Sequence, residues 1–182
     1  MATRSNEAIV AAIAAFVRES PANRSVHLDG GPFWVEPLVG FASGDDAIFE
    51  EYKEIVGGFH MTPREIMSLH LADAGLSGAD ADTEEINVIS WVLPASEPMR
   101  RSNRRETECP SIEWAHGRDH GERLNRLLRE HVVSLVERLG GQAVAPMLSA
   151  HFETKRFDSV GWGSNWSERH VAYACGLGTF GL

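Results

Sequence analysis

Cysteine is scarce in this chain. The 182 residues include two cysteines, Cys109 and Cys175, which lie far apart and belong to no Cys-x-x-Cys pair. A disulfide framework and a self-contained zinc-thiolate or iron–sulfur site are therefore not expected within these residues. Two isolated thiols are typical of a protein from a reducing compartment, so we expect a cytoplasmic localisation.

Positive charge and long apolar runs are also in short supply. Lysine and arginine total 17 against 26 aspartates and glutamates, which gives a formal net charge of −9. This balance disfavours a surface that coats nucleic acid or binds acidic membranes. No run approaches the roughly 18 apolar residues of a membrane span, so no membrane partner is expected. The remaining composition, 43% apolar and 24% charged, is that of an ordinary globular domain, and we expect one domain over residues 1–182.

The pattern of apolar residues predicts a mixture of helices and strands without strict β-α-β alternation. We therefore expect an α+β domain, with α/β as the second choice. Helices are predicted at 5–20, 45–56, 62–75, 121–139 and 166–175; an extended edge segment at 33–41; a central covered strand at 86–93; a strand at 142–148; a polar turn at 78–82; and a long connection at 95–110. The helix at 62–75 should begin with a capping box of Thr62 and Glu65, and glycines should end the helices near positions 75, 140 and 176.

Two groups of charged or metal-ligating residues stand outside this pattern. His116 and His120 are four residues apart, the helical spacing of a metal site, with Asp119 between them; a third ligand would have to come from elsewhere, and nearby glycines argue against a regular helix. The alternative is a polar helix start with solvated histidines. The connection at 95–110 carries four arginines, which either bind an anionic group or pair with nearby acids: Arg100, Arg101, Arg104 and Arg105.

The C-terminal segment combines aromatic, glycine and ionisable residues. Residues 161–170 read Gly-Trp-Gly-Ser-Asn-Trp-Ser-Glu-Arg-His, a composition that suits a large planar ligand or, alternatively, a surface turn with a helix cap at Asn165 and Glu168. The glycine-rich run at 176–181 closes a predicted helix and does not open one, which disfavours a dinucleotide-binding loop. Cys175 is better explained as a small core residue than as a nucleophile.

The same segment resembles a known family. Residues 164–182, Ser-Asn-Trp-Ser-Glu-Arg-His-Val-Ala-Tyr-Ala-Cys-Gly-Leu-Gly-Thr-Phe-Gly-Leu, resemble a signature of epoxyqueuosine reductase-like proteins, which belong to a group with the cobalamin-dependent reductive dehalogenases. Segments 37–46, 110–116 and 143–146 resemble the same branch. The resemblance implies a nitroreductase-like layered domain, with a mixed or antiparallel sheet flanked by helices, that holds cobalamin.

The resemblance also implies partners and an electron path. A ferredoxin-like segment with iron–sulfur clusters follows this domain in the family, so we expect that segment to be absent from this chain and the chain to be cut before it. The expected partners are the corrinoid, a small-molecule or nucleoside substrate, and a ferredoxin-like domain or other electron donor; a homo-oligomer is compatible with them. A chain of this kind would be an oxidoreductase only when complete.

Site residues carry over from the resemblance residue by residue. Those expected to contact the corrinoid are Trp162, Ser164, Asn165, Trp166, Arg169, His170, Gly176, Gly178 and Phe180. The chain lacks the family's proton-donating aspartate about six residues before the Glu-Arg pair, so the donors considered are Asp158, Asp119 and Tyr173, in that order. This loss leaves a second hypothesis open, a non-catalytic corrinoid-binding or electron-transfer docking module. A third hypothesis is a metal-assisted hydrolase built on His116 and His120.

Overall fold

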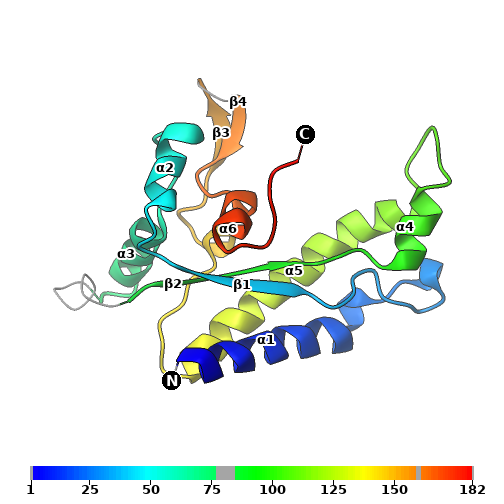
Figure 1. Ribbon diagram of the computed structural model, residues 1–182, viewed down its shortest axis with the longest axis horizontal. Helices are drawn as coiled ribbons and strands as arrows, with labels where there is room; N and C mark the ends of the chain where they lie inside the picture. The colour runs from blue at the N-terminus through cyan, green and yellow to red at the C-terminus, as the bar shows by residue number, and fades with distance from the viewer. Residues whose placement is uncertain (1, 77–84, 159–160, 182) are drawn as a thin grey trace. The chain divides into compact units, whose positions relative to one another are not determined.

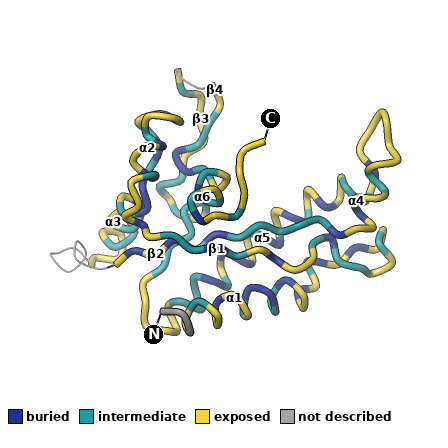
Figure 2. The backbone as a smooth tube through the Cα atoms, in the orientation of Figure 1, coloured by how far each residue is buried: buried dark blue, intermediate teal, exposed yellow. Residues whose placement is uncertain are grey.

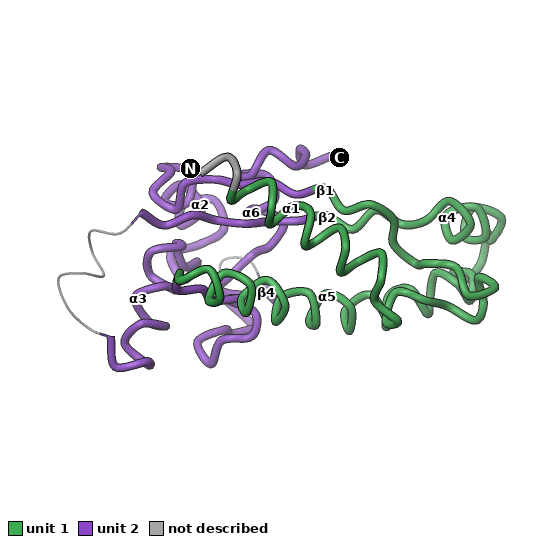
Figure 3. The backbone as a smooth tube through the Cα atoms, turned by 90° about the horizontal axis from the view of Figure 1, so that it is seen from below, with its two compact units in different colours: residues 1–38, 92–141 green, residues 39–91, 142–182 purple. Residues whose placement is uncertain are grey.

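The computed structural model describes residues 2–76, 85–158 and 161–181, and the turn predicted at 78–82 lies outside these residues. The chain divides into two compact units (Figure 3). Unit 1 comprises residues 1–38 and 92–141, and unit 2 comprises residues 39–91 and 142–182. Each unit is therefore built from two segments that are distant in the sequence. The expectation of a single domain stays a prediction.

Unit 1 is a helical unit built on one long helix. Its α-helices are α1 (Ala2–Glu19), α4 (Glu97–Asn103) and α5 (Ile112–Arg138), and two short 3-10 helices, η1 (Pro21–Asn23) and η2 (Val26–Leu28), follow α1 (Figure 1). Helix α1 ends just before Pro21, as predicted, and packs against α5. Buried positions recur along one side of both helices, and they include Ile13, Val17, Leu124 and Leu128 (Figure 2). These side chains form the apolar core of the unit.

One buried asparagine ties the connection after α1 to the core of unit 1. The Asn23 amide donates to the carbonyl oxygens of Val17 and Trp34, at 2.9 Å each, and its Oδ1 accepts the Trp34 backbone N–H at 2.9 Å. Asn23 is fully buried. Because all of these backbone groups would otherwise lack partners, the amide replaces the water that they lose on folding.

Helix α5 begins nine residues earlier than the sequence predicts. The prediction was wrong because Gly117 and Gly121 suggest a break, whereas both lie buried inside the helix. A Cβ at Gly117 would come within 2.6 Å of the Met99 sulfur, and one at Gly121 within 2.8 Å of the Trp34 ring. The two glycines therefore allow neighbouring side chains to approach the helix backbone, a tertiary requirement that offsets their low helix propensity.

Unit 2 is built from short helices and strands and contains most of the sheet structure. In chain order it holds β1 (Leu38–Ser43), α2 (Ile48–Ile55), α3 (Pro63–Asp73), β2 (Asn87–Val92), η3 (Pro146–Leu148), β3 (Thr154–Phe157), β4 (Gly161–Ser164) and α6 (Glu168–Ala174). Strands β1 and β2 pair with each other, and the antiparallel β3–β4 hairpin forms a second sheet with Thr154 opposite Ser164. The terminal residues Leu38 of β1 and Val92 of β2 belong to unit 1, so these strands carry the chain between the units.

The core of unit 2 is formed by side chains that include those of α2, α3, β2 and α6. Its buried members include Phe49 and Tyr52 of α2, Ile66 of α3, Val88 of β2 and Val171 of α6. The predicted capping box starts α3: the Thr62 hydroxyl accepts the Glu65 N–H, and the Glu65 carboxylate accepts the Thr62 N–H. Helix α3 is therefore held both by the burial of its apolar side chain in this core and by its own N-terminal cap.

Four expectations about local structure were wrong. Residues 142–148 form no strand, because Pro146 lacks an N–H for a ladder and opens the 3-10 helix η3 instead. Strand β2 pairs with β1 alone in the described sheets and is not central. The connection at 95–110 contains α4. Helix α6 follows Ser167, not Asn165, because the Asn165 side chain is bonded elsewhere.

The class of the fold agrees with the sequence. The chain is α+β, about half helical, with two small two-stranded sheets. The finer expectation, a nitroreductase-like arrangement, stays a prediction. No helix among the described residues combines the length and apolar character needed to cross a membrane.

Candidate functional site

Five aromatic side chains of unit 2 form a group that we call the ring cluster: Tyr52, His60, His170, Tyr173 and Phe180. The His170 ring centroid lies 4.9 Å from those of both Tyr52 and Phe180, and 6.2 Å from that of His60. The Tyr173 and Phe180 centroids are 5.7 Å apart. The cluster therefore joins three predicted residues, His170, Tyr173 and Phe180, with two from the first third of the chain.

His170 is fixed by two hydrogen bonds. Its Nδ1 lies 2.7 Å from the Ser167 hydroxyl, and its backbone carbonyl accepts a hydrogen bond from the Tyr52 hydroxyl at 2.8 Å. Burial lowers the pKa of His170, and the positive charge of Arg169 lowers it further. The imidazole is consequently held in one position and favoured in its neutral form.

His60 is fully buried at the base of the cluster. Its Nε2 accepts the backbone N–H of Ser167 at 3.2 Å, so in the neutral ring the proton is on Nδ1. Nδ1 has no hydrogen-bond partner among the described residues. Burial lowers the His60 pKa to about 4, with the positive charges of His170 and Lys53 acting in the same direction. His60 is therefore a neutral ring that holds the first turn of α6 in place.

The tyrosine and thiol beside His60 are also shifted toward their neutral forms. Burial raises the pKa of Tyr52 to about 12, and the neighbouring Tyr173 and Cys175 add to the effect. Burial raises the pKa of Cys175 to about 11. This thiol packs in the core of unit 2 and is unsuited to act as a nucleophile at neutral pH, as the sequence indicated.

A charged pair lies beside the backbone of His60. The Lys53 ammonium donates to the His60 carbonyl at 2.9 Å and to both oxygens of Glu65, at 2.9 and 2.8 Å. Burial would raise the pKa of Glu65, but hydrogen bonds from Lys53 and from the Thr62 backbone outweigh burial and lower it. The same carboxylate thus caps α3 and anchors the lysine that fixes His60.

The glycines after α6 end the helix and leave open space beside it. Gly176 has φ 72°, and its N–H bonds the Tyr173 carbonyl while Leu177 N–H bonds that of Ala172, which is a Schellman motif. A Cβ at Gly176 or Gly178 would meet nothing within 4 Å. Phe180 is 53% exposed and Tyr173 43% exposed. The backbone here can therefore be approached by a flat group without collision.

Three other residues predicted to contact a cofactor point to internal partners instead. The Asn165 amide donates to the His151 carbonyl and accepts the Glu153 N–H, at 2.8 and 2.9 Å. The Ser164 hydroxyl donates to the Trp166 carbonyl, and Trp166 is buried in the core of unit 2. These three side chains hold the segment between β4 and α6 in place.

Trp162 and Arg169 are the predicted contact residues that face solvent outside the ring cluster. Trp162 is 77% exposed on β4, opposite Arg156 of β3. Arg169 is exposed in the first turn of α6. Both are accessible to a ligand.

The three predicted proton donors lie in different places. Tyr173 belongs to the ring cluster, whereas Asp158 is exposed at the turn between β3 and β4, and Asp119 is exposed on α5 of unit 1. None of the ring contacts or hydrogen bonds described for the cluster includes Asp158. Among these donors, Tyr173 is the one that the described geometry associates with the other site residues.

The two remaining charged groups differ in their surroundings. Arg100 and Arg101 lie on α4 and pair with Glu97, at 2.8 and 3.6 Å, which favours the alternative of surface ion pairs. Arg104 and Arg105 are exposed beyond the end of that helix. His116 and His120 lie on α5 with their ring centroids 5.9 Å apart.

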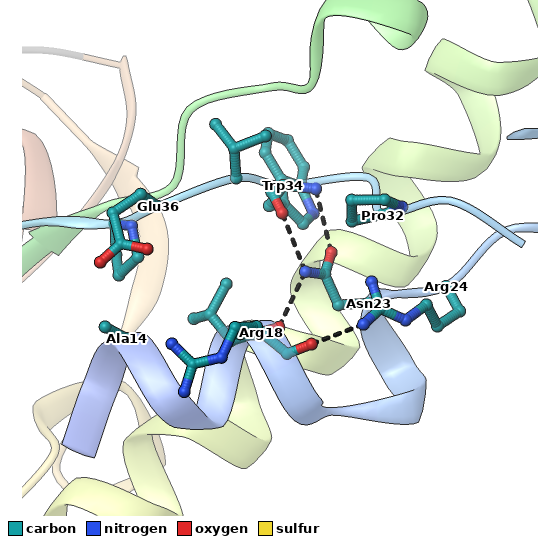
Figure 4. Close-up of a pocket in the computed structure, with 10 residues that line it drawn as sticks. Ala14, Arg18, Asn23, Arg24, Pro32, Trp34 and Glu36 are labelled. Carbon is teal, nitrogen blue, oxygen red and sulfur yellow. Dashed lines mark hydrogen bonds between the residues drawn. The ribbon is translucent and has the colours of Figure 1, made fainter. Parts of the chain in front are cut away.

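A separate small cavity lies in unit 1 beside Asn23 (Figure 4). Its volume is about 110 Å³, and its lining includes Arg18, Trp34 and Glu36 but none of the residues predicted as site residues. The Asn23 amide at its wall is fully engaged by backbone groups, and Arg24 donates to the Arg18 carbonyl. The Asn23 amide and the Arg18 carbonyl are thus engaged by the fold, whereas the buried Trp34 Nε1 has no hydrogen-bond partner among the described residues.

His60, Tyr52 and Ser167 are the site residues that sequence reasoning missed. Nothing near His60 or Tyr52 in the sequence signals a role, because more than 100 residues separate them from α6 and only packing brings them together. Ser167 precedes a helix and was available as an N-cap residue.

Comparison with family models, curated proteins and solved structures yields no match for this chain.

Proposed function

We propose that this chain is the N-terminal, corrinoid-binding domain of an epoxyqueuosine reductase-like oxidoreductase, which acts on an unknown substrate with electrons from iron–sulfur clusters outside the chain. The observation that carries the proposal is the ring cluster beside the open glycine backbone of residues 176–178. It gathers three residues of the segment whose sequence resembles that family: His170, Tyr173 and Phe180.

The residues present fit a corrinoid in two respects. A macrocycle needs apolar, flat surface against its faces, which the exposed rings of Trp162, Tyr173 and Phe180 supply. It also needs backbone that it can approach closely, and the Cβ positions of Gly176 and Gly178 are open. Asn165 and Trp166 do not contribute in this way, because their side chains hold the fold.

When the corrinoid is bound, reduced cobalt supplies the reductive chemistry. The chain's own residues bind and orient. Ser167 and Tyr52 fix His170 through its ring and its carbonyl, and His60 fixes the Ser167 backbone. The Tyr173 hydroxyl is the proton source that lies within the cluster, and it serves as a general acid if a substrate atom reaches hydrogen-bond distance.

The alternative, a corrinoid-binding or electron-transfer docking module without catalysis, is favoured by the positions of the carboxylates. Asp158 and Asp119 are both exposed, on the hairpin turn and on α5, and neither takes part in the contacts described for the ring cluster. The carboxylate described beside His60, that of Glu65, is engaged by Lys53 and by the Thr62 N–H, so the site is better equipped for binding than for proton delivery.

Cobalamin itself is the probe that tests both the enzyme and the binding-module hypotheses. The full chain is mixed anaerobically with cobalamin in each oxidation state, and retention after gel filtration is followed by the visible spectrum. We expect retention by the wild type and weaker retention by Phe180→Ala and Tyr173→Ala, since each removes an exposed ring. Leu139→Ala, which trims an exposed apolar side chain at the end of α5, is the matched control.

Absence of retention in every oxidation state would remove both the enzyme and the binding module. If cobalamin is retained, the chain joined to a ferredoxin-like domain separates them. Reductive turnover that is lost in Tyr173→Phe, with retention unchanged, supports the enzyme. Retention without turnover supports the binding module.

A further inference from the structure

The histidines of unit 1 form a second group, independent of the ring cluster. His116 and His120 lie one turn apart on α5, which continues through Gly117 without a break. The third ring comes from a different element: His27 of η2 has its centroid 4.3 Å from that of His116. Two segments about 90 residues apart in the sequence therefore bring three imidazoles to one surface.

We propose that His27, His116 and His120 bind a transition-metal ion of borderline softness, for which Zn²⁺ is the best suited. Neutral imidazole nitrogens are preferred zinc ligands, with Zn–N distances near 2.0–2.1 Å. This geometry places the centroids of two rings on one tetrahedral ion about 5 Å apart. The observed separations, 4.3 Å for His27–His116 and 5.9 Å for His116–His120, each differ from that value by less than about 1 Å.

The backbone that carries these rings is packed against its neighbours, whereas two of the rings belong to exposed residues. Gly117 on α5 packs against Met99, and the His120 ring stacks on that of buried Phe33, with centroids 5.4 Å apart. His27 and His116 are exposed. In the described conformations no three such side chains are grouped to hold an ion, so binding requires His27 and His116 to rotate toward a common point. Exposed side chains make that change at low cost.

A carboxylate lies on the same side of α5. Glu113 precedes His116 by three residues and His120 by seven, which places all three on one face of the helix. The pKa of Glu113 is lowered, first by a hydrogen bond from its own backbone N–H and then by hydrogen bonds from Ser102 and Ser111, and the His27 ring acts in the same direction. A negative charge beside the three rings favours a cation there and offers a fourth, oxygen ligand.

The test is a titration of the full chain, without a purification tag, with Zn²⁺ at about pH 7.5, where an ordinary histidine is neutral. Calorimetry is expected to give one ion per chain. His27→Ala, His116→Ala and His120→Gln should each weaken binding about tenfold or more. Thermal melts without metal establish that the variants fold, which the exposure of His27 and His116 favours.

Two histidines of unit 2 are the controls. His70 lies on α3, and His151 forms a 2.8 Å pair with Asp73, which is an independent two-ligand arrangement. His70→Ala and His151→Ala should bind Zn²⁺ as the wild type does. Loss of binding in His151→Ala, or full binding in His116→Ala, would overturn the proposal. Full binding in His27→Ala would also overturn it, because a two-histidine helix site would then suffice.

Discussion

The two units bury polar groups of different kinds. Unit 1 buries Asn23 and Arg129, the latter paired with Glu122 at 2.9 Å; neither changes its charge in the ordinary pH range. Unit 2 buries His60 and Cys175, and it places Tyr52 beside them, all with pKa values moved toward the neutral form. Titratable buried side chains are thus found in unit 2, beside non-titrating ones such as Asn165, whereas Asn23 and Arg129 of unit 1 keep their charge.

This difference bears on where in the chain a functional site is expected. Titratable groups with strongly shifted pKa values gather at functional sites more often than elsewhere. In unit 2 they adjoin the exposed rings of Tyr173 and Phe180, whereas the buried Asn23 amide of unit 1 bonds backbone groups. The corrinoid proposal accordingly rests on unit 2, and the metal proposal on the exposed histidines of unit 1.

The largest expected effect comes from the buried asparagine of unit 1. Asn23→Ala leaves two carbonyls and one N–H without partners, which should lower the free energy of unfolding by about 3–4 kcal/mol. Asn165→Ala in unit 2 removes two such bonds and should cost about 2 kcal/mol. Urea denaturation measures both values, and hydrogen exchange shows which unit loses protection.

Arg24→Ala is the control for Asn23→Ala, because it removes an exposed hydrogen bond to the Arg18 carbonyl from the same connection. It should change stability by less than about 0.5 kcal/mol. If Asn23→Ala proves as mild as this control, the buried amide is not what holds unit 1 together, and the contrast between the units weakens.

The next effect is a pH dependence that comes from His60. Its pKa is about 4 in the folded chain and near 6.5 when unfolded, so between these values the unfolded state binds more protons. The contribution to stability is therefore complete above about pH 6.5 and is lost as the pH falls toward 4, by a total of about 3 kcal/mol. Protonation also replaces an acceptor by a donor opposite the Ser167 N–H.

Urea midpoints at several pH values between 7 and 4 measure this slope. His60→Gln should flatten the part of the curve between pH 6.5 and 4, since glutamine has no proton to bind there. Equal slopes for wild type and His60→Gln would show that the ring is not held neutral by burial. Burial also lowers the His170 pKa, so its titration adds to the slope in the same direction.

Local signals in the sequence predicted much of the fold. The Thr62–Glu65 capping box and the glycines that follow α3, α5 and α6 depend on residues within one turn, and each is confirmed. The β3–β4 hairpin was missed because its first strand, Thr154–Phe157, is mostly polar and exposed and lacks an alternating apolar pattern. Its pairing depends on the partner strand, which no local pattern reveals.

The residues of the candidate site also differ in whether a local sequence pattern could group them. His170, Tyr173 and Phe180 lie within eleven residues, so a sequence motif could group them. Tyr52 and His60 join them only through the packing of α2 and the following loop on α6. Likewise, His116 and His120 were visible as a pair, whereas His27 was not, because its place beside α5 is set by the tertiary structure of unit 1.

The smallest expected effects on stability come from alanine substitutions at the two buried glycines of α5, Gly117 and Gly121. Replacing either glycine by alanine gains about 1 kcal/mol of helix propensity, so the sign depends on what the new methyl group meets. At Gly121 it meets the rigid ring of Trp34 at 2.8 Å, and we expect Gly121→Ala to be less stable than the wild type by about 1–2 kcal/mol. At Gly117 it meets the Met99 sulfur at 2.6 Å, on a side chain with several rotatable bonds.

Because Met99 can change rotamer, Gly117→Ala should remain within about 0.5 kcal/mol of the wild type. The pair is its own control: the two substitutions are identical, lie one turn apart on α5, and differ in the neighbour that must move. Urea denaturation under matched conditions measures both. If Gly121→Ala is the more stable of the two, the Trp34 ring yields more easily than the methionine, and close ring packing is not what requires glycine in this helix.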